Sequence, residues 1–281
     1  MVSIVILSYN TSQLLKRCVG SIYNHISSTD IELIVVDNNS NDDSVSMLRK
    51  EFHDVIIIEN KKNEGFTKGN NIGALKAKGD YLLFLNSDIE FIDDSINKMI
   101  DFARQNPLFG VLGGRLLNQD GSIQESFGSF YNLGSVFFML FLQNLKKNEQ
   151  IKEKIKYVDW VSGAFFLIKT SIFLESNKFD ENIFMYVEDV ELCYRVKKLG
   201  YKVVFYPIAK VIHCGQGSSS REFAILNIYK GLRYFYRKHK TKPEYVILDM
   251  LLRFKAILAI GFGIVSGNSY LKKTYIKVLT I

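Results

Sequence analysis

Continuous apolar runs that end in polar residues constrain the fold of this chain more than any other feature. Residues 2–7, interrupted only by Ser3, form one run, followed by Ser8, and a second strand is expected at 31–36, whose last four residues are apolar and are followed by Asp37. Runs without polar alternation are typical of strands buried on both faces. Helix-like and strand-like segments then alternate over the first hundred residues: helices at 13–25, 42–52 and 65–77, strands at 55–58 and 81–85. This alternation predicts an α/β fold, a Rossmann-like mostly parallel sheet flanked by helices.

The chain changes character further on. We expect strands at 110–117, 158–168, 201–206 and 211–213, with an amphipathic helix at 188–199, and largely helical, basic sequence beyond 220. Two domains are predicted: an α/β domain at 1–220 and a helical C-terminal extension at 221–281. Disorder is excluded because 47% of the 281 residues are hydrophobic and 23% charged.

The cysteines and the N-terminus indicate a reducing compartment. Cys18, Cys193 and Cys214 are too few and too scattered for a disulfide framework, and no CxxC pair is present for a zinc ribbon. Residues 1–5 enter a strand-like run directly, without the basic start of a signal peptide. A cytoplasmic location is therefore expected.

The net charge of +7 suggests an anionic partner. Six lysines and arginines lie among aromatic residues at 229–242, which is typical of a membrane-surface patch, although a solvated helix face has the same composition and nucleic acid is a third, less favoured partner. The apolar runs at 133–142 and 256–265 are shorter than the roughly 20 residues that span a bilayer. They can be core or lie in the membrane interface, and we favour peripheral attachment at the inner face of the membrane.

Polar residues gather where the predicted strands end. Ser8, Tyr9 and Asn10 follow the first strand, Asp37 the second, and Asn86, Ser87 and Asp88 the strand at 81–85. Each loop alone is explained by turns and helix caps. Three such loops at one sheet edge favour a ligand site, because open parallel sheets bind ligands there.

Three glycines recur at every fourth residue: Gly65, Gly69 and Gly73. The spacing matches neither a dinucleotide fingerprint nor a P-loop. Close packing of a helix on the sheet explains Gly69 and Gly73. Gly65 and Asn63 lie nearer the helix N-terminus, where exposed N–H groups attract anions.

Two further groups suggest chemistry. Asn86 and Asp88 can present oxygen ligands to Mg²⁺ or Mn²⁺, and His213 can complete such a site, although a lone histidine is usually structural. Glu188 and Asp189 open a helix, where acids are favoured by the helix dipole. A general base at that position is the functional alternative.

Taken together, these motifs resemble the inverting glycosyltransferases of family 2, which have the GT-A fold. The resemblance covers roughly residues 2–220. The sequence around Asn86–Asp88 and Glu188–Asp189 is most similar to that of bacterial rhamnosyltransferase-like members. The matching pieces are 2–10, 35–42, 63–66, 85–88, 162–164, 179–181, 184–195 and His213.

The resemblance implies roles for individual residues. Asp189 would be the catalytic base, and Asp88 and His213 would approach a divalent cation, Mg²⁺ or Mn²⁺, on the donor diphosphate. Asn86 stands where the family has aspartate, which weakens one cation ligand. The nucleotide would be lined by Ser8, Tyr9, Asn10, Asp37, Asn63, Gly65, Asn86 and Ser87. Residues beside the base or on the acceptor side would be Glu188, Trp160, Gly163 and Arg195.

The function implied is transfer of a sugar from a dTDP- or UDP-linked donor to a saccharide or lipid-linked saccharide in cell-surface polysaccharide synthesis. Rhamnose is the favoured sugar. Another donor sugar and a non-catalytic nucleotide-sugar-binding module are the alternatives. A nicotinamide-dependent dehydrogenase and a nucleotidyltransferase are disfavoured, because the loop 8–12 has no glycine.

Overall fold

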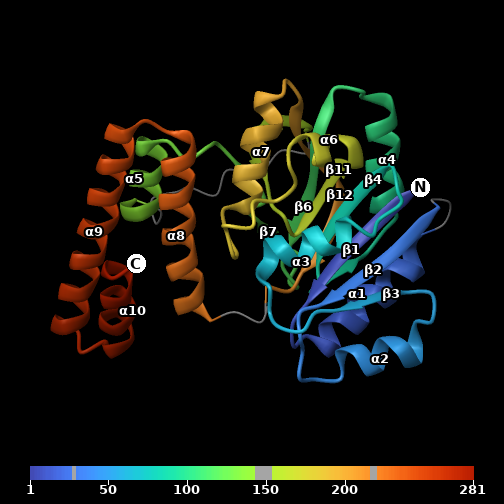
Figure 1. The fold of residues 1–281 in the computed structure, drawn as a ribbon, viewed down its shortest axis with the longest axis horizontal. Coiled ribbons are helices and arrows are strands. Elements are labelled where there is room, and N and C mark those ends of the chain that lie inside the picture. Colours follow the sequence, from blue (N-terminus) through green and yellow to red (C-terminus); the bar gives the residue numbers. More distant parts are fainter. Residues whose placement is uncertain (27–29, 143–153, 216–219) are drawn as a thin grey trace. The chain divides into compact units, whose positions relative to one another are not determined.

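The computed structural model describes residues 1–26, 30–142, 154–215 and 220–281 (Figure 1). Within these ranges a ten-stranded sheet has the order β3-β2-β1-β4-β11-β6-β12-β5, with β7 on β6 and β9 on β12. The strands are β1 (Val2–Ser8), β2 (Ile31–Asp37), β3 (Ile56–Glu59), β4 (Tyr81–Asn86), β5 (Ile89–Phe91), β6 (Phe109–Leu117), β7 (Ile123–Gln124), β9 (Lys156–Val158), β11 (Phe165–Lys169), β12 (Lys202–His213), and the separate pair β8 (Phe127–Gly128) and β10 (Trp160–Val161).

The first four strands of the sheet are parallel, as the sequence predicts, and the order becomes mixed at β11, which is antiparallel to β4 and β6. The helices are α1 (Ser12–His25), α2 (Ser44–Glu51), α3 (Gly65–Ala74), α4 (Ser95–Gln105), α5 (Leu133–Phe141), α6 (Thr170–Glu175), α7 (Glu188–Lys198), α8 (Arg221–His239), α9 (Lys242–Val265) and α10 (Ser269–Leu279).

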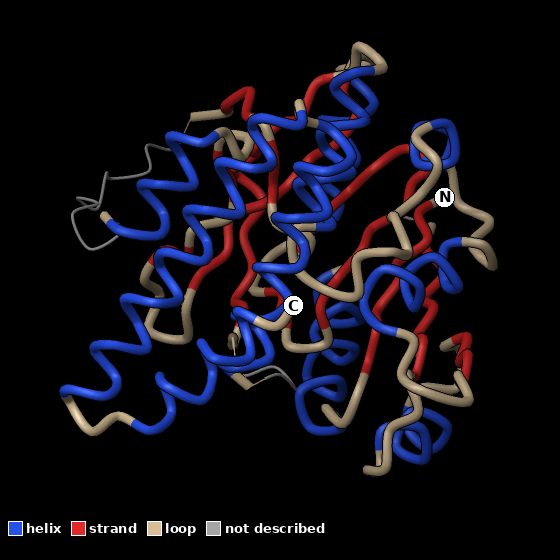
Figure 2. Tube along the Cα trace, turned by 60° about the vertical axis from the view of Figure 1, so that its left-hand side comes forward, coloured by secondary structure: helices blue, strands red, loops and turns tan. Residues whose placement is uncertain are grey.

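Side-chain alternation along the strands gives the sheet two buried faces. Ile4 and Ile6 of β1 join a core with residues of α1 and α4, whereas Val5 and Leu7 face α3. Figure 2 distinguishes the strands (red) from the helices (blue). The predicted close packing of α3 is confirmed: a Cβ on Gly73 would lie 2.5 Å from Val5 Cγ1, and one on Gly69 would contact Leu7.

Two sequence-based strand predictions differ from the structure. The single strand expected at 158–168 is divided into three: β9 pairs with β12, β10 pairs with β8, and β11 lies between β4 and β6 and pairs with both. The two strands expected at 201–206 and 211–213 form one, β12, whose register shifts between Tyr206 and Lys210. Pro207 lies in this irregularity, and proline lacks the N–H that a regular ladder needs.

The described residues form two compact units, which we describe separately. The first holds 188–215 and the described residues of 1–128 and 151–184; the second holds 185–187, 220–281 and the described residues of 129–150. The predicted division into independent domains at residue 220 stays a prediction.

The second unit consists of α5, α8, α9 and α10. Its core contains Leu232 and Phe235 of α8 with Leu248 and Leu252 of α9. Helix α9 begins with a capping box between Thr241 and Glu244, which satisfies exposed backbone donors of its first turn. Among the described helices, none combines the length and apolar character that a membrane crossing requires.

Candidate active site

The three polar loops predicted at one sheet edge do meet there. The strand register aligns Ser8 with Asp37 and Leu7 with Asn86, so the ends of β1, β2 and β4 are adjacent. Behind them, the Ser8 and Thr11 hydroxyls lie 3.0 Å apart, and Thr11 donates to the Ser87 hydroxyl at 2.9 Å. Hydroxyl contacts therefore join the loop after β1 to the loop after β4.

The loop after β2 carries a buried carboxylate with an unused oxygen. Asp37 Oδ2 accepts the Ser40 N–H at 2.9 Å, whereas buried Oδ1 has no hydrogen-bond partner among the described residues. Asn10 adopts a left-handed φ of 55° and binds this loop twice, through Ser40 Oγ and the Asn41 N–H. Burying an acceptor without a donor is unfavourable, so Asp37 Oδ1 is suited to receive a ligand N–H. Tyr9, beside Asn10, is half-buried.

The loop before α3 is held by amide side chains. Asn63 Oδ1 accepts the Gly65 N–H at 3.0 Å and the Asn38 amide at 3.2 Å. Gly65 has a φ of +82°, and a Cβ there would lie 2.7 Å from the Phe184 ring, so only glycine fits. Asn63 and Gly65 thus shape the loop, and their predicted contact with a nucleotide stays a prediction.

Asp88 and His213 lie together, as the sequence predicts. His213 Nε2 is 3.3 Å from Asp88 Oδ1 and 3.3 Å from the Asn86 amide nitrogen. The Cys214 N–H also donates to the Asp88 carbonyl at 3.0 Å, which ties the end of β12 to this turn. The structure therefore brings together the amide at the end of β4, the carboxylate of the following turn and the imidazole at the end of β12.

Gln124 of β7 determines which nitrogen of His213 carries the proton. Its amide group donates to the His213 carbonyl at 2.7 Å and to Asn118 Oδ1 at 2.6 Å, so its oxygen faces His213 Nδ1 at 2.8 Å. Because that oxygen only accepts, Nδ1 is the protonated nitrogen of the neutral ring. The lone pair of Nε2 then faces Asp88 and Asn86.

Asp189 is held at the first turn of α7. Its Oδ2 accepts the Gly163 N–H at 3.1 Å and its Oδ1 accepts the Val190 N–H at 2.8 Å. Burial raises the pKa of Asp189, although these N–H groups favour its charged form. Burial, and then the charge of Asp189, raise the pKa of neighbouring Glu188 well above its ordinary value. The pair therefore titrates together, and one of the two carboxyls stays protonated more readily than an exposed acid.

The loop 162–164 connects Asp189 to the turn at Asn86. Gly163 holds Asp189, and the next residue, Ala164, accepts the Asn86 N–H at 3.2 Å. Both contacts use backbone groups of this loop, which immediately precedes β11, so their position is set by the sheet. Asp189 and Asn86 are thus fixed to the same short loop.

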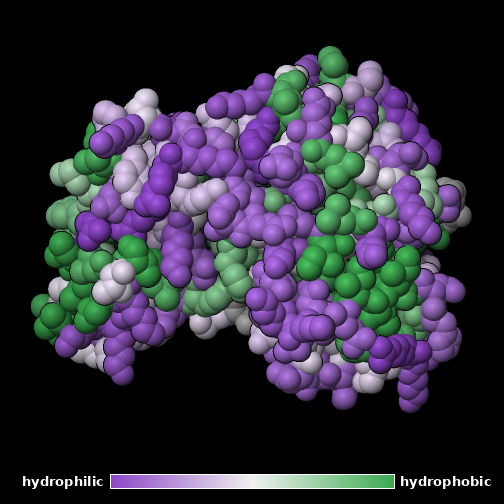
Figure 3. All heavy atoms as spheres, viewed as in Figure 1, coloured by the Kyte–Doolittle hydropathy of each residue, from purple (hydrophilic) through white to green (hydrophobic). Residues whose placement is uncertain are grey.

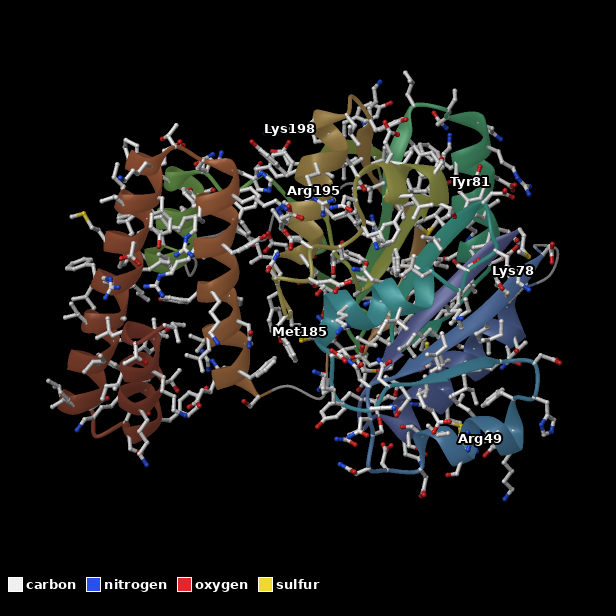
Figure 4. The ribbon with its side chains drawn as sticks, viewed as in Figure 1. Arg49, Lys78, Tyr81, Met185, Arg195 and Lys198 are labelled. Atoms are coloured by element: carbon white, nitrogen blue, oxygen red, sulfur yellow. The ribbon has the colours of Figure 1, made fainter. Side chains whose placement is uncertain are left out.

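Two other predicted residues lie elsewhere. Arg195, which Figure 4 shows on α7, binds buried Glu191 through Nε and Nη2 and donates to the Lys178 carbonyl at 2.7 Å. This ion pair explains why a charged Glu191 is tolerated inside the protein. Trp160 of β10 covers Gly128 of β8. Roles for either residue on the acceptor side stay predictions.

The family model described as "Glycosyl transferase family 2" matches residues 3–175 of the chain. The chain belongs to glycosyl transferase family 2. A relative with curated function, "N-acetylglucosaminyl-diphospho-decaprenol L-rhamnosyltransferase" from Mycobacterium tuberculosis (strain CDC 1551 / Oshkosh), is 25% identical over 239 residues, 78% of each chain.

Solved glycosyltransferases share the fold. "Crystal structure of GalNAc-T7 with UDP, GalNAc and Mn2+" superposes with a TM-score of 0.62 at 18% identity, over 84% of this chain and 49% of that chain. "Mannosyltransferase PcManGT from Pyrobaculum calidifontis in complex with GDP-Man and Mn2+" gives 0.59 at 15% identity, over 99% and 74%. The chain spans about half of the first solved chain. The predicted GT-A fold is confirmed.

The residues of this glycosyltransferase can be tested for their fit to a divalent cation. In the described part of the chain, no three His, Cys, Asp or Glu side chains are placed to hold a metal. Asp88 and His213 alone are two such ligands, and their acceptor atoms face each other at 3.3 Å. Mg²⁺ and Mn²⁺ are commonly held by one or two protein ligands together with substrate phosphates and waters. The donor set fits a cation that binds with the diphosphate.

Gln124 is the residue of this site that the sequence analysis missed. It belongs to a two-residue strand of ordinary polar sequence, without a motif. A histidine that ligates metal usually donates its other N–H to a fixed acceptor. That rule predicts a partner for His213, but only the fold shows that the partner is Gln124.

Proposed function

We propose that this family 2 glycosyltransferase is an inverting enzyme that transfers a sugar, rhamnose first, from a nucleoside-diphosphate donor to a saccharide or lipid-linked saccharide of a cell-surface polysaccharide. The observation that carries the proposal is the loop 162–164. It holds the Asp189 carboxylate at one residue and the Asn86 turn at the next. A base and a diphosphate site on one rigid loop suit attack opposite a departing diphosphate.

Asp189 acts as the general base. Its carboxylate takes the proton of an acceptor hydroxyl, whose oxygen forms a bond to the anomeric carbon. The bond from that carbon to the diphosphate oxygen breaks on the opposite face, and its electron pair leaves with the nucleoside diphosphate. The raised pKa of Asp189 brings its basicity closer to neutral pH than that of an exposed aspartate, which suits proton abstraction.

A divalent cation, Mg²⁺ or Mn²⁺, is proposed to be held by Asp88 and His213, with the Asn86 amide beside them. When bound, it supplies positive charge to the departing diphosphate. The two solved relatives that contain Mn²⁺ support metal use. Asp37 Oδ1, buried and unpaired among the described residues, is proposed to accept a base N–H.

The proposed donor and acceptor follow from similarity to a relative with curated function. The relative from Mycobacterium tuberculosis is named for rhamnose transfer to a sugar on a decaprenyl diphosphate. A dTDP- or UDP-linked sugar is therefore the proposed donor, and a prenyl-diphosphate-linked saccharide the proposed acceptor. A lipid-linked acceptor places the reaction at a membrane surface.

The second unit carries a surface suited to that membrane, which we call the α9 face. It is an exposed apolar stripe along α9, spaced at three to four residues, with two phenylalanines of α5 also exposed. Its residues are Val246, Met250, Phe254, Ile257, Leu258, Phe262, Val265, Phe137 and Phe138. Figure 3 shows hydrophobic side chains gathered over α9 and α10. The run 256–265 is thus largely exposed rather than core.

Charge identifies the surface that the α9 face fits. Residues 220–281 hold 12 lysines and arginines against three acids, a net +9, whereas the whole chain is +7. The rest of the chain is therefore slightly acidic. An apolar stripe within a strongly basic segment suits an anionic lipid surface, where apolar contact and electrostatic attraction act together. Peripheral attachment at the inner face of the cell membrane, without nucleic acid as a partner, is proposed.

Product analysis tests the proposed function. The purified chain is incubated with dTDP-rhamnose, UDP-sugars or GDP-mannose and a prenyl-diphosphate-linked N-acetylglucosamine, with and without Mn²⁺. We expect one donor to be consumed in a Mn²⁺-dependent way and the product to have the opposite anomeric configuration by NMR. Retained configuration would contradict an inverting mechanism. Nucleoside-diphosphate binding without turnover of any donor would support the alternative of a non-catalytic module.

A further inference from the structure

The segment immediately before the Glu188–Asp189 pair has an unusual backbone. Tyr186 and Val187 have φ values of 68° and 72°, both in the left-handed region. That region is rare for residues with side chains, and a β-branched residue such as Val187 is a strong outlier there. Such a conformation persists only where the surroundings enforce it, and it clusters at functional sites.

The surroundings of Val187 come from α8. A Cβ on Gly231 would lie 2.9 Å from Val187 Cγ2, 3.0 Å from Val187 Cβ and 3.0 Å from the Tyr186 carbonyl oxygen. Val187 is almost completely buried by this packing. Residues 185–187, beginning with Met185 (Figure 4), accordingly belong to the helical unit, although 184 and 188 belong to the sheet unit.

The same stretch of chain is fixed on its N-terminal side by α3. The Phe66 N–H donates to the Phe184 carbonyl at 2.7 Å, and the Thr67 hydroxyl donates to the Ile183 carbonyl at 2.5 Å. Two residues after Val187 comes Asp189. The hydrogen bonds to α3 thus fix the chain up to Phe184, and the packing on Gly231 fixes Val187, each within its own unit.

Gly231 has no conformational reason to be glycine. It lies inside the 19-residue helix α8 and does not have a positive φ. Glycine in a helix interior is less favourable than alanine, so its presence calls for a packing reason. The close approach of Tyr186 and Val187 is such a reason.

We propose that Gly231 and Val187 are positioning residues for Asp189: the helical unit, through this contact, holds the left-handed segment that aims the carboxylate at the acceptor hydroxyl. The proposal rests on the proposed role of Asp189 as base. It assigns the helical unit a part in catalysis that is separate from membrane attachment.

The substitution Gly231→Ala tests the contact. Its methyl group must displace Val187 or the Tyr186 carbonyl, and the displacement passes along two residues to Asp189. We expect kcat to fall about 10- to 100-fold, since misplacement of a catalytic group by about 1 Å has effects of this size. The KM for the donor and stabilisation by a nucleoside diphosphate with Mn²⁺ should change little. Gly20→Ala is the matched control, because Gly20 is a helical glycine with no atom within 4 Å of the added Cβ.

A second substitution separates positioning from general damage. Val187→Gly removes the side chain that the alanine methyl would meet and tolerates a positive φ. The double variant Gly231→Ala/Val187→Gly should therefore be more active than Gly231→Ala alone, a non-additive result that identifies direct coupling. A purely structural loss would make the double variant worse than either single one.

Hydrogen exchange gives a readout that does not depend on turnover. Amides of 183–190 should exchange faster in Gly231→Ala than in the wild type, and slower again in the double variant. Unchanged exchange of 183–190 in Gly231→Ala would overturn the proposal, as would unchanged kcat. If the wild type transfers no sugar, the proposed function fails, and the exchange data still decide whether α8 holds this segment.

Discussion

Asp189 and Glu188 are two adjacent carboxyls whose surroundings give them different tasks. Asp189 accepts two backbone N–H groups, so its charge is stabilised, whereas Glu188 Oε2 is buried without a hydrogen-bond partner among the described residues. The buried glutamate is therefore the better carrier of a shared proton, and the aspartate the better base.

The substitution Asp189→Asn removes the proposed base and keeps the shape of the side chain. General base catalysis typically contributes about 10²–10⁴-fold, so we expect kcat to fall by that factor while donor binding persists. Steady-state kinetics together with thermal-shift titration with a nucleoside diphosphate measures both. Residual transfer near the wild-type rate would assign the base to another residue.

Glu188 should make the stability of the protein dependent on pH. Its pKa is raised in the folded state, so the folded protein binds its proton more tightly than the unfolded chain. Its contribution is complete below the unfolded pKa, about 4.3, and is lost as the pH rises through the raised folded pKa. Tm measured against pH should thus fall more steeply in the wild type than in Glu188→Gln. If the two Tm-against-pH curves are parallel, the Glu188 side chain binds its proton no more tightly in the folded protein than in the unfolded chain.

Gln124 should tune metal affinity through His213. Gln124→Ala frees the Nδ1 proton of His213 from its acceptor, and loss of such an orienting partner typically lowers metal affinity 10–100-fold. The Mn²⁺ concentration for half-maximal transfer should rise accordingly. Gln105→Ala, at an exposed position of α4, is the control. An unchanged Mn²⁺ requirement would remove His213 from the cation site.

At the scale of elements, the sequence predicts a strand or helix well where the hydrophobic period and composition of that segment alone determine its structure. The runs of β1, β2 and β4 and the polar residues after them were predictable, because period and composition carry that information. The division of 158–168 into three strands was not, since each piece is defined by a different neighbouring strand. In the same way, Asp88 and His213 could be named from the chain, whereas Gln124 and Gly231 act through contacts with distant residues.

Helix α3 gives a stability prediction at this scale. In Gly73→Ala the added methyl meets Val5 and Val36, and overpacking of a buried contact typically costs about 1–3 kcal/mol. In Gly20→Ala the methyl meets nothing, and helix propensity predicts a gain of up to about 1 kcal/mol. Urea denaturation should give opposite signs for the two. The same sign for both would mean that α3 does not depend on close packing against β1.

At the scale of the whole molecule, the positive charge and the exposed apolar stripe occur in the same helical unit, and the membrane prediction follows from this. Met250 and Phe254 are 65% and 54% exposed on the α9 face. Replacing both with glutamate should release the protein from anionic vesicles in a sedimentation assay, because a negative charge then faces the lipid. Leu75→Glu, at a 61% exposed position of the sheet unit, should leave vesicle binding unchanged. If the double variant binds vesicles as well as the wild type does, the α9 face is not the lipid-binding surface.

The route of the chain between its two units has a consequence for engineering. Among the described residues, the polypeptide enters the helical unit at 129, returns to it for only three residues at 185–187, and belongs to it again from 220 onward. No single cut can therefore separate the two parts. A fragment that ends at 220 keeps every residue proposed to contact the donor but lacks Gly231, so we expect it to be a nucleotide binder that is a poor transferase. Chimeras between relatives must therefore carry residues 185–187 and α8 together.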